Sequence, residues 1–425
     1  MGFTFFKNTV LLVVLTIFSC GSSTEKKEQS EVRKEKQEAS VKTRDAQIIV
    51  AAEQFHLYSE MLKGKNVGVV ANQTSIVKEK TNPTEINGNV SYLILNTHLV
   101  DFLISKNISV TKVFAPEHGF RGTADAGEHV KDGVDAKTGV PLISLYGSNK
   151  KPSHEQLKGI DVVVFDIQDV GARFYTYIST LHYVMEACAE AGIPVIVLDR
   201  PNPNGHYIDG PIMESENQSF VGMHPIPVVH GMTIGEYATM INGEAWLKNK
   251  VKCKLTVIEM QNYTHKTPYA LPIKPSPNLP NDKAINLYPS LCFFEGTFIN
   301  AGRGTDMQFQ IFGAPNLPAS KYPFQYTPES NEGSKSPKFK GHLCQGKDLR
   351  NEPRLNKLNL EWLIDAYNAN GKKKDFFNSF FVKLAGTEKL QQQIEQGVSA
   401  EEIRDSWKEG LSEFQKTREK YLLYP

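Results

Sequence analysis

Charged and amide side chains follow short apolar runs at several places in this 425-residue sequence. The pair Glu117–His118 comes directly after the run 110–115 and a proline, which restricts the backbone in front of the glutamate. A carboxylate placed in this way is suited to general acid or base catalysis, and His118 could tune it or bind substrate. The alternative for such a pair on a loop is a solvated turn. We predict a catalytic role, because other polar clusters follow neighbouring runs.

Three further acidic residues could act together with Glu117. Asp166 and Asp169 follow the apolar run 161–165, and Glu295 comes from the other half of the chain. Paired acids can share catalytic work or bind a divalent cation. Since the sequence contains no HxH, HExxH or DxDxD pattern, we predict no metal site and no cofactor.

A larger group of side chains is typical of substrate binding. Arginine makes paired hydrogen bonds to carboxylates, which suits an acidic sugar, and aromatic rings could stack on a sugar ring. Asn72 could instead belong to a plain turn, and Arg173 could form an ion pair with Asp166 or Asp169. The predicted substrate-binding residues are Asn72, Arg121, Gln168, Arg173, Tyr175, Asp199, Arg200, Asn202, Asn204, His230 and Arg303.

The apolar runs must position these side chains. Runs of four to six apolar residues bounded by turn signals are typical of buried strands, and helical stretches between them imply parallel pairing. The sequence therefore predicts a Rossmann-like, doubly wound α/β domain, with its polar residues at the carboxyl edge of the sheet. No GxGxxG follows a strand, which excludes a dinucleotide. The predicted strands are 65–70, 110–115, 140–146, 161–165, 194–198 and 254–260, the predicted helices are 55–62, 91–106, 153–159 and 175–191, and 125–138 is an irregular loop.

The later part of the chain changes in character. A short strand is expected to end at 230–232, and Thr233 with Glu236 forms a capping-box pattern that starts a helix. The proline-rich stretch 271–289 predicts an ordered connector. We expect a catalytic domain over 46–270 and a smaller α/β domain over 271–425 that completes the cleft. The predicted elements of the smaller domain are a strand at 339–344 and helices at 360–368, 373–384, 388–396 and 400–421.

The first 45 residues differ from the rest. Lys7 and the apolar run 10–18 are typical of a secretory signal, because the run is too short to span a bilayer stably. Cys20 follows a small residue, so we predict a lipoprotein signal over 1–20 with Cys20 lipidated; an ordinary signal peptide is the alternative. The charged stretch 21–45 cannot bury enough surface to fold and predicts a linker. We therefore expect a periplasmic or cell-envelope protein, lipid-anchored to a membrane.

The charge balance and the cysteine content limit the kinds of partner and of covalent or metal cross-link that the chain can have. With 48 basic and 47 acidic side chains, the chain offers no electrostatic attraction to nucleic acid. The cysteines after Cys20 form no CxxC pair, which argues against a disulfide framework and a zinc site. Cys188 lies in a helical pattern and is predicted to be a packed core thiol.

Several segments together resemble the bacterial exo-β-N-acetylmuramidase family, the NamZ-like proteins. They are GVVANQTS, VFAPEHGFRG, DGVDAKTGVPLISLYG, VVVFDIQDVGARFYTYISTL, LDRPNPNG, PIPVVHGMTIGEYA, LYPSLCFFEGT, AGRGT and KYLLYP. The resemblance extends from about Phe55 to Pro425. It implies a Rossmann-like domain, a smaller C-terminal domain and a site between them. It also implies release of terminal N-acetylmuramic acid from the non-reducing end of peptidoglycan fragments, with Glu117 as a catalytic residue.

The chemistry implied by this resemblance agrees with the residues. Glycoside hydrolysis usually needs two carboxylates, so Asp166, Asp169 or Glu295 could act opposite Glu117. Assistance by the substrate's 2-acetamido group would need only one acid and an orienting partner. An arginine could bind the lactyl carboxylate of muramic acid. Two rival hypotheses are a non-catalytic, lipid-anchored binding protein for muramyl fragments and a metal-dependent hydrolase that uses Asp166, Asp169 and His118.

Overall fold

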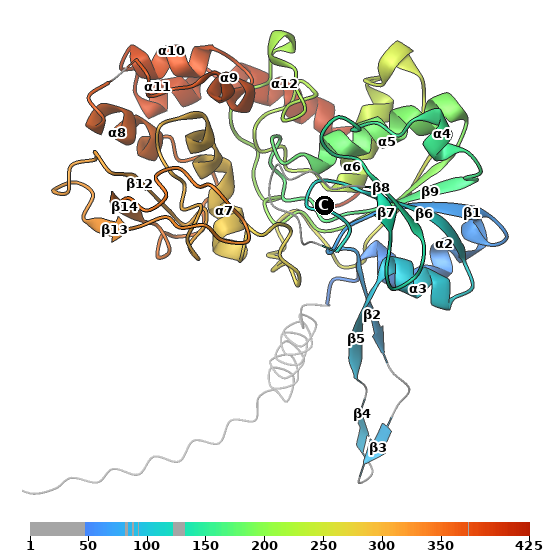
Figure 1. The fold of residues 1–425 in the computed structure, drawn as a ribbon. Coiled ribbons are helices and arrows are strands. Elements are labelled where there is room, and N and C mark those ends of the chain that lie inside the picture. The colour runs from blue at the N-terminus through green and yellow to red at the C-terminus, as the bar shows by residue number, and fades with distance from the viewer. Residues whose placement is uncertain (1–46, 81–83, 87–88, 92, 122–131, 373) are drawn as a thin grey trace, which may run out of the picture. The chain divides into compact units, whose positions relative to one another are not determined.

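The computed structural model describes residues 47–425 except 81–83, 87–88, 92, 122–131 and 373 (Figure 1). The predicted signal peptide with Cys20 and the predicted linker 21–45 lie outside the described residues, and so does much of the predicted loop 125–138. None of the helices in the described ranges is long and apolar enough to cross a membrane.

Six of the apolar runs pair into one parallel sheet, in the order β11-β10-β9-β1-β6-β8-β7, with β7 antiparallel at the edge. β1 pairs with β6 on one side and with β9 on the other, so the winding of the chain reverses at β1. This arrangement confirms the predicted Rossmann-like α/β class. The strands are β1 (Asn66–Ala71), β6 (Ser109–Ala115), β7 (Gly133–Val134), β8 (Pro141–Ser144), β9 (Val162–Asp166), β10 (Val195–Leu198) and β11 (Leu255–Ile258).

Both faces of the sheet are covered, which explains why its strands are apolar at successive positions rather than alternate ones. In β9, Val163 and Phe165 pack into the core that includes α5 and α6. Val162 and Val164 pack into a second core with α2 and α3. Figure 1 shows α4 and α5 on one side of the sheet and α2 and α3 on the other. These helices are α2 (Phe55–Leu62), α3 (Leu99–Ser105), α4 (His154–Leu157), α5 (Tyr177–Ala191) and α6 (Ile234–Gly243), with short 3-10 turns η1 (Ala51–Glu53), η2 (Ser215–Asn217) and η3 (Lys248–Lys250).

The predicted helix-end signals are present. Thr233 Oγ1 accepts a hydrogen bond from Glu236 N at 3.2 Å, and Thr233 N donates to Glu236 Oε2 at 2.9 Å. This capping box starts α6, as predicted. Gly192 follows α5 in the left-handed conformation, with φ of 71°. Cys188 is fully buried, which confirms a core thiol, and the four cysteines in the described residues are unpaired.

The predicted helix 91–106 is half wrong. Residues 94–98 form β5, which pairs antiparallel with β2, and α3 starts only at Leu99. The apolar spacing suits a helix, but the backbone groups of β5 find partners on β2, and His98 Nδ1 caps α3 by accepting from Val100 N at 3.2 Å. Tertiary pairing therefore overrides the local pattern. The strands are β2 (Ile76–Lys80), β3 (Thr84–Ile86), β4 (Asn89–Ser91) and β5 (Ile94–His98).

The second domain contains a small antiparallel sheet, in the order β12-β14-β13, and helices from α7 onward. The predicted strand 339–344 is misplaced, because β14 starts at Cys344. The predicted long helix 400–421 is broken at Ser406–Trp407. The elements are α7 (Asp282–Leu291), η4 (Cys292–Gly296), β12 (Ile311–Ala314), β13 (Phe324–Tyr326), β14 (Cys344–Asp348), α8 (Glu361–Ala369), α9 (Ser379–Ala385), α10 (Lys389–Glu395), α11 (Ala400–Asp405) and α12 (Lys408–Glu419).

Two other predicted elements also differ. The connector predicted over 271–289 ends early, because Asn281 caps α7 by accepting from Ala284 N at 3.0 Å, and α7 then includes Pro289. The short strand expected before Thr233 is reduced to isolated bridges from Val229 to Ala172 and Asp209. The cap of α7 is local, whereas the bridges of Val229 join residues distant in sequence.

The chain returns to the parallel sheet after α12. Tyr424 donates its hydroxyl hydrogen to Asp199 Oδ2 at 2.7 Å, and Leu423 N donates to Glu236 Oε1 at 2.9 Å. One core runs without a break from Phe165 in β9 to Phe381 in α9. The second domain is therefore tied to the parallel-sheet domain at both of its ends.

Candidate active site

The carboxyl ends of β1 and β9 meet at the point where the winding reverses, with Ala71 opposite Asp166. The loop after β1 is fastened to the loop after β9, because Gln168 N donates to Thr74 Oγ1 at 3.0 Å. Asn72 is fully buried, and its Oδ1 accepts from Thr74 N at 2.9 Å. Gln168 Nε2 donates to Pro201 O at 2.6 Å. Asn72 thus binds its own loop, whereas Gln168 joins the loop after β9 to the loop after β10.

Glu117 lies on the next loop, after β6, and is half-buried. Gly119 N donates to Pro116 O at 3.0 Å, which closes a turn with Glu117 and His118 at its centre. His118 has φ of 71°, a conformation that is uncommon for any residue but glycine and that clusters at functional sites. The His118 side chain is buried. The turn therefore holds a strained backbone and presents the glutamate at the sheet edge.

The carboxylate of Glu117 is held at the start of α5. Thr176, which directly precedes that helix, donates its hydroxyl hydrogen to Glu117 Oε2 at 2.8 Å. The first N–H groups of a helix carry partial positive charge, so this position suits an anion. The interaction joins the loop after β6 to the loop after β9.

Tyrosines surround Glu117. Burial, and then the charge of Glu117, raise the pKa of Tyr146. Burial is also the main cause that raises the pKa of Tyr175 and of Tyr288, with Glu117 contributing in both cases. The ring of Tyr175 lies 4.8 Å from Tyr177 and 5.8 Å from Tyr288, between ring centres. Because Tyr288 belongs to α7, this cluster is built from both domains.

The second domain adds an ion pair to this region. Arg303 Nε lies 3.0 Å from Glu295 Oε1, and the two side chains keep 23% and 22% of their surface exposed. The guanidinium also lies over the ring of Phe309, which contacts Tyr288 at 4.9 Å between ring centres. Arg303 and Glu117 therefore approach Tyr288 from different domains. We refer to Glu117, Tyr146, Tyr175, Tyr177, Tyr288, Glu295 and Arg303 as the Glu117 cluster.

Asp166 and Arg200, two other predicted site residues, bind each other. Arg200 Nε donates to Asp166 Oδ1 at 2.5 Å and Nη2 donates to Oδ2 at 2.8 Å. Their side chains are 0% and 3% exposed. The structure thus places this pair inside the fold, where it joins two strand ends.

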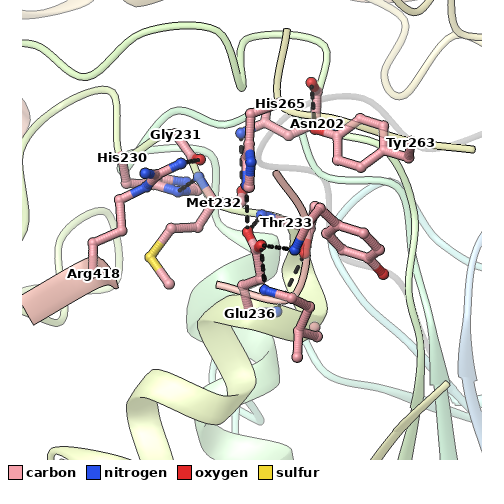
Figure 2. A network of polar contacts seen from close by, with 12 residues as sticks. Asn202, His230, Gly231, Met232, Thr233, Glu236, Tyr263, His265 and Arg418 are labelled. Carbon is pink, nitrogen blue, oxygen red and sulfur yellow. Dashed lines mark hydrogen bonds and ion pairs between the residues drawn. The ribbon is translucent and has the colours of Figure 1, made fainter. Parts of the chain in front are cut away.

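The loop 199–205 is equally buried. Asp199 accepts from Thr233 Oγ1 at 2.7 Å and from Gly235 N at 2.8 Å. Asn202 Nδ2 donates to Met232 O at 2.9 Å, and Asn204 Nδ2 donates to Ile285 O at 3.0 Å. Figure 2 shows part of this network, in which Asn202 lies near Tyr263 and Glu236 contacts His265. These contacts fasten α6 and α7 to the sheet.

Arg173 makes neither of the two predicted ion pairs. Its guanidinium is buried and donates only to carbonyl oxygens, which belong to Pro211, Ile226, Leu384 and Ala385, at 2.6–3.0 Å. Burial lowers its pKa to about 9. The predicted pairing with Asp166 or Asp169 is therefore wrong, and Arg173 instead links the parallel-sheet domain to α9.

Asp169 and His230 form a separate buried pair. Asp169 Oδ2 accepts from Gly171 N at 2.7 Å and lies 3.7 Å from His230 Nε2. Burial raises the pKa of Asp169 to about 7 and lowers the pKa of His230 to about 3. Arg121 lies elsewhere, on the surface, in ion pairs with Asp135 and Asp101. Among the described residues, no group of three His, Cys, Asp or Glu side chains could hold a metal ion.

Sequence reasoning did not single out Thr176, Tyr146 or Tyr288 as site residues. Their role depends on contacts with Glu117 from segments that are 29 to 171 positions away along the chain. The signal that could have found them is their occurrence inside the motifs VPLISLYG, FYTYISTL and LYPSLCFFEGT.

Comparison with known proteins agrees with this architecture. Residues 67–283 match the family described as exo-beta-N-acetylmuramidase NamZ, N-terminal, and residues 286–424 match its C-terminal counterpart. The chain is 40% identical over 388 residues to the peptidoglycan beta-N-acetylmuramidase NamZ of Bacillus subtilis (strain 168), covering 86% of this chain and 89% of that protein. Two crystal structures of DUF1343 family proteins from Bacteroides fragilis NCTC 9343 share the fold. The first has a TM-score of 0.78 at 44% identity and the second 0.72 at 29%, each covering 89% of this chain and 99% of the other. This chain therefore belongs to the NamZ family of exo-β-N-acetylmuramidases.

Proposed function

We propose that this protein is an exo-acting β-N-acetylmuramidase that releases terminal N-acetylmuramic acid from the non-reducing end of peptidoglycan fragments. The observation that carries the proposal is that both NamZ domains are matched over nearly the whole folded chain, residues 67–424, with Glu117 at their junction. Glu117 is half-buried and lies among tyrosines. Its carboxylate can therefore contact a glycosidic oxygen while the tyrosine side chains lie beside the sugar ring.

Glu117 acts as the general acid. It gives its proton to the glycosidic oxygen as the bond to the anomeric carbon breaks, and the resulting carboxylate later takes a proton from the attacking water. Thr176 fixes the carboxylate through a hydrogen bond to Oε2 at 2.8 Å. Tyr175 and Tyr288, only 7% and 8% exposed, supply apolar ring faces next to it.

The other candidate carboxylates each have a partner. Asp166 is bound to Arg200, Asp169 is buried beside Gly171, and Glu295 is paired with Arg303. A mechanism that needs one acid fits this arrangement better than one that needs two. We propose that the substrate's acetamido oxygen attacks the anomeric carbon while Glu117 protonates the leaving oxygen, and that water then opens the cyclic intermediate.

Hydrolysis of a β-linked chromogenic muramide tests the activity, with the corresponding N-acetylglucosaminide and an EDTA-treated sample in parallel. We expect cleavage of the muramide that survives EDTA. Binding of muramyl fragments without any cleavage would instead identify a capture protein, and loss of cleavage in EDTA would identify a metal-dependent hydrolase.

The role of Glu295 is tested in the same assay. If the acetamido group is the nucleophile, Glu295→Gln should lower the rate less than tenfold, and a substrate with an N-trifluoroacetyl group should react much more slowly. A loss of roughly 10²–10⁴-fold in Glu295→Gln, together with azide restoring the rate of Glu295→Ala, would instead make Glu295 the second catalytic carboxylate.

We further propose that the protein is lipid-anchored through Cys20 in the periplasm or cell envelope. The signal-like run 10–18, the cysteine and the charged stretch 21–45 support this proposal. Incorporation of labelled palmitate in cells, lost in Cys20→Ala, is the expected result. Release of the wild-type protein into the soluble fraction without label would contradict it.

A further inference from the structure

Muramic acid differs from N-acetylglucosamine by a lactyl group that ends in a carboxylate, so a selective site needs a cation for it. Of the four predicted arginines, three are already occupied. Arg121 binds two aspartates, Arg173 binds carbonyl oxygens and Arg200 binds Asp166. Arg303 differs, because within the described residues its contacts are those of Nε with Glu295 and of the guanidinium plane with Phe309. Its two terminal nitrogens donate to no described residue.

The backbone holds Arg303 in a fixed position. It lies between Gly302 and Gly304, which have φ of 78° and 80°, a conformation that favours glycine. A Cβ at position 304 would lie 2.5 Å from Pro337 Cγ, and one at position 302 would lie 2.6 Å from Met307 O. Asn300 Nδ2 donates to Arg303 O at 3.1 Å. Side chains at positions 302 and 304 would clash with these neighbours, so the turn that carries Arg303 requires both glycines.

The platform under the guanidinium is also strained. Phe309, over which Arg303 lies at 5.2 Å, has φ of 50°, and it is fully buried. Phe309 in turn supports Tyr288, which adjoins Tyr175. Arg303 therefore contacts Tyr288 through Phe309, and Tyr288 is one of the tyrosines around Glu117.

The charged groups around Arg303 have a net positive charge that could bind one anion. Lys338 donates its ammonium hydrogens to the carbonyl oxygens of Phe294 and Thr297, both at 2.8 Å, and so holds the turn that contains Glu295. Arg303 and Lys338 both interact with the charge of Glu295, and these three groups together carry one surplus positive charge. A guanidinium can bind one carboxylate through Nε and a second through its terminal nitrogens.

We propose that Arg303 binds the lactyl carboxylate of N-acetylmuramic acid, and that Glu295 holds the guanidinium in place for it. This inference rests on the proposed muramidase function. It makes Arg303 the residue that separates muramic acid from N-acetylglucosamine, with Tyr288 between the carboxylate subsite and the general acid.

The test compares the chromogenic muramide with its lactyl amide, which has the same shape and no charge. We expect the wild type to prefer the acid by about 10- to 100-fold in kcat/KM, the range for a hydrogen-bonded charge. Arg303→Gln should abolish that preference, so that the acid and the amide are cleaved with the same kcat/KM. Arg303→Lys, which keeps the charge but not the fork of donors, should retain an intermediate preference.

Arg350→Gln is the matched control. Arg350 also pairs with a carboxylate, Asp348 at 2.7 Å, and also lies over a phenylalanine, Phe324 at 5.9 Å, but on the exposed surface of the second domain. It should keep the full preference for the acid. A preference for the acid that survives in Arg303→Gln would overturn the inference.

Calorimetry with N-acetylmuramic acid and its amide separates the two proposals. Arg303-dependent preference for the acid without any hydrolysis would remove the muramidase function and leave the carboxylate subsite standing. Hydrolysis of the muramide, with the acid and the amide bound and cleaved equally, would instead keep the muramidase function and remove the carboxylate subsite.

Discussion

Two groups of polar residues at the carboxyl edge of the sheet have opposite environments. In the buried group, Asp166 and Arg200 satisfy each other in a pair whose side chains are 0% and 3% exposed. In the Glu117 cluster, Arg303 and Glu295 form a similar pair that keeps about a fifth of its surface open. A strand-end position is therefore not enough to identify a catalytic group. What separates the groups is whether protein atoms or solvent cover the ion pair.

Glu117→Gln should produce the largest effect on rate and almost none on stability. Loss of a general acid lowers the rate by roughly 10²–10⁴-fold, whereas the isosteric amide keeps the side-chain volume and can still accept from Thr176. The muramide assay and a urea unfolding curve measure the two effects. A rate within about tenfold of wild type would remove Glu117 from the acid role.

Asp166→Asn should do the opposite. Removing one partner of a buried ion pair leaves Arg200 uncompensated and costs about 3–5 kcal/mol of unfolding free energy. The rate per folded molecule should stay close to that of wild type. Urea denaturation checks this, with Asp348→Asn as the control, since that exposed pair with Arg350 should contribute little to stability. A stable Asp166→Asn variant with a greatly reduced rate would place Asp166 in the active site.

The same contrast explains what the sequence could predict. The apolar runs place six strands and the edge that carries Glu117, because a strand covered on both faces is apolar throughout. The capping box at Thr233 is equally local. Which strand-end residues are covered depends on distant segments. Arg173 looked like an ion-pair residue, but its partners include the carbonyl oxygens of Leu384 and Ala385, more than 200 positions away. Thr176 and Tyr288 were missed for the same reason.

The buried group should also show itself in the pH dependence of stability. Burial raises the pKa of Asp169 from its ordinary value of 3.8 to about 7, while His230, at 3.7 Å, stays neutral because its own pKa is lowered to about 3. An acid whose pKa is higher in the folded state stabilises the fold fully below its unfolded pKa and loses that contribution as the pH rises towards 7.

Relative to Asp169→Asn, the wild type should therefore lose about 2–3 kcal/mol of unfolding free energy between pH 5 and pH 7, at about 1.4 kcal/mol per pH unit. Urea unfolding curves of both proteins across this range give the difference. If the difference in unfolding free energy between the two proteins stays constant from pH 5 to pH 7, Asp169 is already ionised in the folded state at pH 5.

The smallest effect is expected at Thr176, which lies at the boundary between the two groups. It is 9% exposed, like the buried residues, but its hydroxyl donates to the half-open Glu117 at 2.8 Å. Thr176→Val keeps the shape and removes the hydrogen-bond donor. The transition state should therefore lose about 0.5–1.5 kcal/mol of stabilisation. That corresponds to a drop in kcat of roughly two- to tenfold with KM little changed. Thr176→Ser retains the hydroxyl and should restore most of the rate. If Thr176→Val keeps the wild-type rate while Thr176→Ser is slow, the methyl group's packing rather than the hydrogen bond is what Thr176 contributes, and the boundary between scaffold and site moves to exclude it.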